Sequence, residues 1–164
     1  EMIYISQIGR SFVLDKTTDT WETTHWNGLG QEFSYQGYGI WKNNNNIYYS
    51  YYSQHYILNE NTNTWIAKEW NTLPEFYENA PIWTDGINAY YSSGTSHYVL
   101  DESTDTWVEK TWNGLTDFSG SYIWTDENNI YYSYGSDQYV LNKATDTWEE
   151  KQWNGVSNIA GAAY

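Results

Sequence analysis

Tryptophan recurs in this chain with a spacing that divides the sequence into four repeats. Four tryptophan pairs have members five residues apart, and their first members are Trp21, Trp65, Trp107 and Trp148. These first members follow one another at intervals of 44, 42 and 41 residues. Three further tryptophans follow isoleucine, at Trp41, Trp83 and Trp124, and complete the 11 in the sequence. A period of this length is typical of repeat architectures built from one supersecondary unit.

The last copy, residues 120–155, shows the unit in full. It predicts four short strands, a to d, at residues 121–126, 130–133, 138–142 and 148–153. Asn, Asp, Gly and Thr stand at the breaks, which is the pattern of successive β-hairpins. Trp148 and Trp153 have opposite parity in the predicted strand d, so we expect them to lie on opposite faces of one sheet.

Composition and length favour one all-β domain over residues 1–164. Aromatic residues make up 20% of the chain and methionine occurs once, and large aromatic side chains suit half-buried pleated surfaces. A chain of 164 residues is long enough to bury a core of its own. The expected repeats cover approximately residues 2–37, 38–79, 80–119 and 120–156, followed by a closing strand at 157–164.

The charge of the chain excludes several classes of partner. Seven basic and 21 acidic residues give a formal net charge of −14, which repels phosphate backbones. We therefore expect no nucleic-acid partner and no anionic membrane partner. The absence of cysteine excludes disulfides and cysteine-based zinc sites, and no apolar run reaches the roughly 18–20 residues of a membrane helix. No signal in the sequence assigns a compartment.

The unit resembles the kelch repeat. In the last copy this resemblance rests on Ile-Tyr-Tyr-Ser at 130–133, Gly135, Tyr-Val-Leu-Asn at 139–142, Thr-Asp-Thr at 145–147 and Trp148. It covers nearly the whole chain. The resemblance implies a β-propeller of four-stranded antiparallel blades, with four kelch-like blades here and the C-terminal strand completing the first blade.

The sequence departs from the kelch pattern in two respects. The family's glycine doublet is reduced to Gly94 and Gly135, shifted to Gly9 in the first copy, and replaced by Tyr52-Ser53 in the second. The kelch arginine near the start of strand a is also missing. Three closures stay open: a four-bladed ring of one chain, a larger ring of two chains, or part of a longer propeller.

Comparison of the four copies separates a repeated part from a variable part. The a–b and c–d turns change little between copies, whereas the b–c loops and the d–a connections differ. In an antiparallel meander the b–c and d–a segments emerge at the same edge of the sheet. Loops on a rigid scaffold commonly carry recognition, although unconstrained loops also drift.

The variable segments are rich in tyrosine, phenylalanine and carboxylates, which suit a protein or glycan ligand. Each single tyrosine is also explained by packing between blades. The candidate ligand-binding residues are Glu32, Phe33, Tyr35, Tyr38, Tyr51, Tyr52, Glu75, Phe76, Tyr77, Glu78, Asp117, Phe118, Tyr134 and Asp137.

Metal and catalytic sites are weakly indicated, and we expect no cofactor, no metal and no enzyme activity. Asp101 and Asp105 place two carboxylates in one loop, but their counterparts Asn59 and Asn63 are neutral, and such turns form without calcium. Equivalent histidines of different blades are expected to lie far apart. Kelch-like propellers include oxidases with a copper site of Tyr, His and Cys, and this chain has no Cys.

These observations predict a non-catalytic binding module that recognises a protein or glycan through the b–c and d–a loops. The alternative is a structural protein whose repeats or terminal strands associate between chains, giving a homo-oligomer. An enzyme of the galactose-oxidase-like type is the third reading.

Overall fold

The computed structural model describes residues 3–7, 10–24, 26–29, 40–51, 53–72, 82–118, 122–126 and 128–155. Within these residues the chain forms β-strands, turns and connecting segments. No helix in this part of the chain is long and apolar enough to cross a membrane. Two compact units cover Glu1–Glu69 and Trp70–Tyr164. The single domain expected over residues 1–164 stays a prediction.

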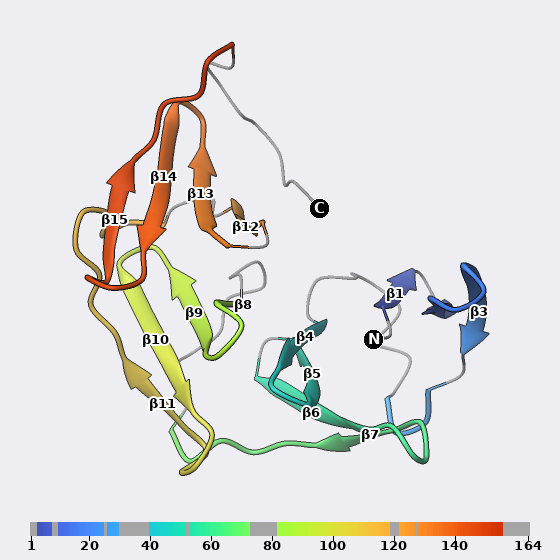
Figure 1. Ribbon diagram of the computed structural model, residues 1–164. Coiled ribbons are helices and arrows are strands. Elements are labelled where there is room, and N and C mark those ends of the chain that lie inside the picture. The colour runs from blue at the N-terminus through green and yellow to red at the C-terminus, as the bar shows by residue number, and fades with distance from the viewer. Residues whose placement is uncertain are drawn as a thin grey trace. The chain divides into compact units, whose positions relative to one another are not determined.

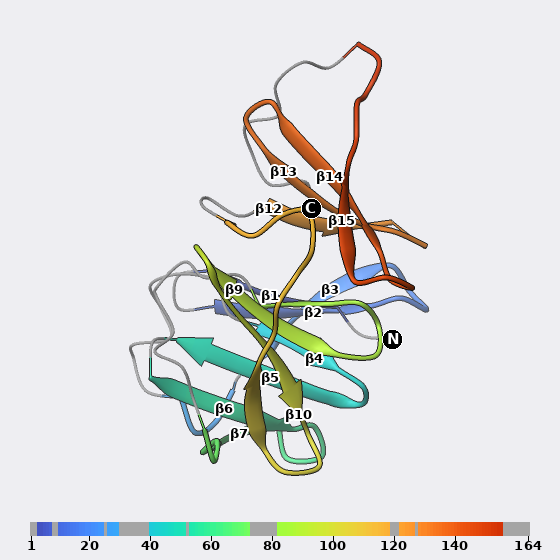
Figure 2. The ribbon, with the colours of Figure 1, turned by 90° about the vertical axis from the view of Figure 1, so that its left-hand side faces the viewer.

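The first unit contains two antiparallel sheets. One has three strands in the order β1 (Ile3–Gln7), β2 (Arg10–Asp15) and β3 (Thr20–Thr24). The other has four strands, visible side by side in Figure 2, which are β4 (Ile40–Asn43), β5 (Asn46–Tyr51), β6 (Gln54–Asn59) and β7 (Thr64–Ala67).

The second unit contains two four-stranded antiparallel sheets. The strands of the first are β8 (Ile82–Thr84), β9 (Ala89–Ser93), β10 (Ser96–Asp101) and β11 (Thr106–Glu109). Those of the second, in chain order in Figure 1, are β12 (Tyr122–Thr125), β13 (Ile130–Tyr134), β14 (Asp137–Asn142) and β15 (Thr147–Glu150). The all-β class and the tandem repeat are thus confirmed, while the closing strand at 157–164 lies outside the described residues.

Strand d is shorter than the sequence predicts. In the last repeat it ends at Glu150, so Trp153 lies three residues beyond the strand. Among the described residues beyond Glu150, one backbone bond, from Lys151 N to Gln138 O at 2.7 Å, holds the chain to its own sheet. The prediction that strand d extends to Trp153 was therefore wrong. The two tryptophans still lie on opposite faces of the sheet, because Trp148 packs by Tyr132 and Trp153 by Tyr131, its neighbour in β13.

The repeated Thr-Asp/Asn-Thr turn between strands c and d has a backbone cause. Its central residue adopts a left-handed conformation in every repeat, and Asp and Asn tolerate this region better than most residues. The residues and their φ angles are Asp19 (55°), Asn63 (49°), Asp105 (53°) and Asp146 (52°). The second threonine hydroxyl of the turn donates to the first threonine's carbonyl, at 3.1 Å from Thr147 to Thr145.

A second repeated element links strands a and b. Trp83 of β8 stacks on Tyr90 of β9 with ring centroids 4.3 Å apart, and its Nε1 donates to Ser92 Oγ at 3.2 Å. The stacked pairs Trp41–Tyr48 and Trp124–Tyr131 have separations of 4.3 and 4.2 Å. Stacking and the indole hydrogen bond together fix the strand-a tryptophan, as is usual for buried Trp.

The second tryptophan of each pair begins a connector, which we define as the three residues 26–28, 70–72, 112–114 or 153–155. In the second unit Asn113 N donates to Asp146 O at 3.2 Å, and Trp148 N donates to Asn113 O at 2.9 Å. A connector thus pairs in parallel with the strand d of the next repeat. The three described bridges are Asn27 with Thr64, Thr72 with Thr106 and Asn113 with Thr147.

Tryptophan packing accompanies each of these junctions. The connector tryptophan lies against the strand-d tryptophan of the next repeat, and the latter is almost fully buried. The pairs are Trp26–Trp65 at 5.6 Å, Trp70–Trp107 at 5.9 Å and Trp112–Trp148 at 6.1 Å between ring centroids. At each of these three junctions, the second tryptophan of one pair therefore packs on the first tryptophan of the next pair.

The connector glycine allows a close approach, and this predicts the effect of Gly114→Ala. Gly114 has φ +83°, and an added Cβ would lie 2.0 Å from Trp148 O. Gly86 has φ +92° but nothing within 4 Å of an added Cβ, so Gly86→Ala measures the backbone strain alone. We expect Gly86→Ala to lower the free energy of unfolding by about 1 kcal/mol, and Gly114→Ala by a further ~1–3 kcal/mol.

Urea denaturation of both variants measures this difference. Equal losses of unfolding free energy for Gly86→Ala and Gly114→Ala would show that the connector does not lie against Trp148.

Candidate functional site

The b–c turns of the second unit are tight two-residue hairpins. Gly135 (φ +60°) and Ser136 connect β13 to β14, and glycine at the first central position is typical of a two-residue hairpin turn. The register pairs Tyr134 with Asp137 across this turn. Tyr134 is 47% exposed and Asp137 is also exposed, so a phenol and a carboxylate stand together at the end of the hairpin.

In repeat three the d–a connection lies against the b–c turn of the same repeat. Phe118 N donates to Gly94 O at 2.8 Å, and the two residues form an antiparallel bridge. The preceding residue, Asp117, is exposed. The b–c turn and the d–a connection of this repeat therefore share one edge of the sheet. We call the b–c turns and d–a connections the variable edge, and the a–b and c–d turns the repeated edge.

Phe118, predicted as a ligand-binding residue, is buried in the core. Its side chain is 1% exposed and packs edge-on against His97 at 4.6 Å, Tyr132 at 5.2 Å and Trp148 at 5.5 Å. These partners belong to repeats three and four, so the ring joins two sheets. Its position leaves Asp117, Tyr134 and Asp137 as the candidates with exposed side chains in the described part of the chain.

The other candidates fall outside this description. At Tyr51 the structure describes the backbone, which ends β5 and pairs with Gln54. The residues that lie outside the described ranges are Glu32, Phe33, Tyr35, Tyr38, Tyr52, Glu75, Phe76, Tyr77 and Glu78.

A buried polar residue on strand c makes a hydrogen bond in each of three repeats, and in repeats three and four this bond reaches the variable edge. In repeat three His97 Nε2 donates to Thr116 O at 3.1 Å, which holds the d–a connection. In repeat four Gln138 Nε2 donates to Gly135 O at 3.2 Å, which holds the b–c turn. In repeat two His55 Nδ1 lies 3.0 Å from Ser50 Oγ, which also accepts a hydrogen bond from Trp41 Nε1 at 3.0 Å.

Burial keeps these histidines neutral. Desolvation lowers the pKa of His55 to about 4. Desolvation also lowers the pKa of His97, opposed by its hydrogen bond to the Thr116 carbonyl and by the charge of Asp117. Among the described residues no three His, Cys, Asp or Glu side chains lie close enough to hold a metal ion together. The histidines therefore act as structural supports in this part of the chain.

The carboxylates of the repeated edge are engaged in their own turns. Asp126 accepts hydrogen bonds from Asn128 N at 2.8 Å and Asn129 N at 2.7 Å, and these lower its pKa to about 2. Asp15 Oδ1 accepts from Thr17 N at 2.8 Å, and Asp101 Oδ1 accepts from Ser103 N at 3.0 Å. Hydrogen bonds from backbone N–H groups thus stabilise these turns as Asx turns.

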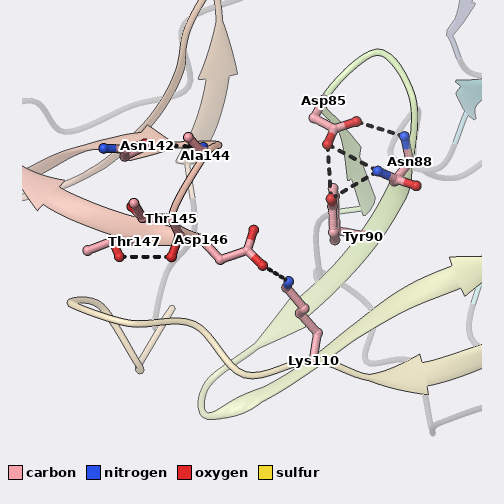
Figure 3. Close-up of polar contacts among 9 residues, drawn as sticks. All are labelled: Asp85, Asn88, Tyr90, Lys110, Asn142, Ala144, Thr145, Asp146 and Thr147. Atoms are coloured by element: carbon pink, nitrogen blue, oxygen red, sulfur yellow. Dashed lines mark hydrogen bonds and ion pairs between the residues drawn. The ribbon is translucent and has the colours of Figure 1, made fainter.

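A hollow at the junction of repeats three and four was not predicted from the sequence. It has a volume of about 440 Å³ and is lined by Asp85, Ile87, Asn88, Tyr90, Val99, Lys110, Leu141, Lys143 and Asp146. Figure 3 shows Lys110 reaching Asp146, with which it forms an ion pair, while Tyr90 donates to Asp85 at 2.9 Å. This hollow lies on the repeated edge and is lined by residues of two adjacent repeats. The sequence of a single repeat therefore does not predict it.

No protein-family model matches the chain, and no curated protein sequence matches it either.

The neutral histidine predicts a specific acid sensitivity. A histidine whose folded pKa lies below its unfolded value of 6.5 stabilises the fold above pH 6.5, and this stability is lost as pH falls to about 4. For His55 the loss is about 3 kcal/mol. His55→Gln, which copies the residue of repeat four, should remove that loss. Urea denaturation between pH 7 and 4 measures it.

The range below about pH 4 serves as the control, because the Asp126 pKa of about 2 makes both proteins lose stability there. If the unfolding free energies of the wild type and His55→Gln fell in parallel between pH 6.5 and 4, the claim that His55 is neutral in the folded protein would be contradicted.

Proposed function

We propose that the chain is a non-catalytic recognition module, a kelch-like propeller whose variable edge binds a protein or glycan ligand. The observation that carries this proposal is the contrast within β13. The residues Ile130 to Ser133 are buried, and Tyr131, Tyr132 and Ser133 repeat those of β9. Tyr134 at the end of the strand is 47% exposed and is replaced by serine in repeat three.

The propeller arrangement is supported by three features. Each sheet is an antiparallel meander in chain order, the unit recurs every 41–44 residues, and each described connector pairs with the outer strand of the next repeat. Radial repetition of four-stranded sheets is one way in which all-β proteins protect their edges. Completion of the first sheet by residues 157–164, supplied by the same chain or by a second copy, belongs to the same proposal.

The non-catalytic assignment is supported by the state of the titratable groups in the described residues. His55 and His97 are buried and held neutral, and the turn carboxylates accept backbone hydrogen bonds. At the variable edge the exposed groups are the Tyr134 phenol and the carboxylates of Asp117 and Asp137. A tyrosine ring offers a rigid contact surface with a polar tip, and carboxylates accept hydrogen bonds from hydroxyl or amide groups of a ligand.

Self-association of the chain is a second candidate function, and one observation favours it. Trp21 of β3 is 43% exposed, whereas its counterparts Trp65, Trp107 and Trp148 are 2%, 3% and 1% exposed. The three buried tryptophans are those covered by a connector.

Exchange of one hairpin turn tests the recognition proposal. Residues 134–137 read Tyr-Gly-Ser-Asp, and residues 93–96 of repeat three read Ser-Gly-Thr-Ser in the same hairpin geometry. We expect the triple variant Tyr134→Ser, Ser136→Thr, Asp137→Ser to keep the melting temperature of the wild type. It should lose at least about tenfold in affinity, equal to 1.4 kcal/mol, for the ligand found by glycan array or protein pull-down.

The matched control is Ile87→Ala, which truncates a more exposed side chain on the repeated edge. Undiminished binding by the hairpin variant, together with a loss in Ile87→Ala, would place the ligand on the repeated edge and overturn the proposal.

A further inference from the structure

The three described junctions share a donor half and an acceptor half. The donor is a connector with its tryptophan, and the acceptor is the outer edge of strand d in the next repeat. At the junction of repeats three and four the donor half is Trp112 with Asn113, and the acceptor half is Thr147 with Trp148. Backbone hydrogen bonds run in both directions between the halves.

The first repeat carries an acceptor half with the same geometry. Its turn has Asp19 at φ 55°, and Thr20 Oγ1 donates to Thr18 O at 3.2 Å, as Thr147 does to Thr145 at 3.1 Å in repeat four. In the described residues no connector bridges to β3. The exposure of Trp21 is the consequence, because its counterparts are covered by a connector tryptophan.

The last repeat carries a donor half that is already in place. Trp153 packs on Tyr131 at 5.4 Å and on Trp124 at 6.2 Å. Trp112 packs in the same way on Tyr90 and Trp83, at 5.3 and 5.7 Å, before it contacts the next repeat. The connector at 153–155 therefore needs no rearrangement of its tryptophan to enter a junction.

A lysine beside the connector tryptophan completes the donor half. Lys151 Nζ lies 5.0 Å from the centroid of the Trp153 ring, as Lys110 Nζ lies 4.7 Å from that of Trp112. Lys110 forms an ion pair with Asp146, the left-handed residue in the turn of the next repeat. Lys151 is the matching donor charge of the last repeat.

At every junction the residue two positions before the connector and the central residue of the next c–d turn are either oppositely charged or both uncharged. A lysine before the connector occurs with an aspartate in the next turn, as in Lys68 with Asp105 and Lys110 with Asp146. Where the donor position is Thr24, the next turn carries the neutral Asn63. The donor half of the last repeat has Lys151, and the acceptor half of the first repeat has Asp19. These two halves therefore carry opposite charges, as at the junctions with lysine and aspartate.

We propose that the connector at 153–155 of one copy pairs with the β3 edge of a second copy, covering Trp21 and placing Lys151 at Asp19. This proposal rests on the second candidate function, self-association. Such a contact joins different surfaces of the two copies, so it is head-to-tail and repeats from copy to copy, as a ring or a filament. The contact buries an exposed tryptophan and satisfies the outer edge of β3.

Two complementary variants test the contact between copies. Trp21→Ala removes the acceptor, and Asn154→Pro removes from the donor the backbone N–H that corresponds to Asn113 N. Sedimentation velocity of the wild type, in about 0.15 M salt to screen the net charge, should show mass rising above 19.3 kDa with protein concentration. Each variant alone should stay at 19.3 kDa.

An equimolar mixture of the two variants provides one intact donor and one intact acceptor. We expect it to form a species of twice 19.3 kDa and nothing larger. Ile66→Ala, which truncates an exposed strand-d side chain with no part in the junction, is the matched control and should associate like the wild type. A mixture that stays at 19.3 kDa, or a wild type that does so at every concentration, overturns the proposal.

Charge reversal tests the lysine–aspartate contact separately. Lys151→Glu places two carboxylates together and should weaken association about tenfold, and adding Asp19→Asn, the residue of repeat two, should restore most of it. Unchanged association in Lys151→Glu, or no gain on adding Asp19→Asn, contradicts this part of the proposal. Ligand binding through the hairpin at 134–137 is measured independently, so its failure and the failure of association are distinguishable.

Discussion

The parallel pairing of each connector with the next strand d is the interaction on which the repeat structure depends. An antiparallel meander leaves the outer edge of its last strand with unpaired N–H and C=O groups, which is a liability for any sheet. Here the preceding repeat covers that edge through bonds such as Trp148 N to Asn113 O. The indole of Trp112 then covers the tryptophan of the strand it pairs with.

This pairing accounts for several sequence features together. The connector glycine allows a backbone approach that a Cβ at Gly114 would block. The left-handed Asp or Asn of the c–d turn positions the carbonyl that accepts from the connector, as Asp146 O does from Asn113 N. The repeated edge is therefore constrained by the neighbouring repeat as well as by its own hairpin. The b–c turns need only a short hairpin geometry, so their side chains differ between repeats.

Much of the fold was predictable because it depends on local patterns. Strands a, b and c follow from short aromatic and β-branched runs between Asn, Asp, Gly and Thr breaks, and the structure confirms them within a few residues. Strand d was extended to Trp153 because an apolar residue at the end of a run resembles strand sequence. Strand d ends at Glu109 in repeat three and at the equivalent Glu150 in repeat four. In repeat three the connector that follows pairs with another repeat, a non-local interaction that the sequence pattern of one repeat does not reveal.

The candidate site was predicted less completely. Tyr134 and Asp137 are exposed as expected, because two-residue hairpin turns place their flanking residues at the sheet edge. Phe118 directly follows Asp117 in the same d–a connection. Its side chain is nevertheless buried, because the residue bridges to Gly94 and packs where two sheets meet. The hollow beside Lys110 likewise depends on adjacent repeats, although the lysine–aspartate match between repeats was available in the sequence.

Backbone hydrogen exchange of the tryptophan amides tests the central claim most directly, by NMR on protein labelled with ¹⁵N-tryptophan. The amides of Trp65, Trp107 and Trp148 donate to connector carbonyls, so they should be strongly protected in dilute protein, while the Trp21 amide exchanges fast. Exchange of these three amides as fast as that of Trp21 would contradict the connector junction.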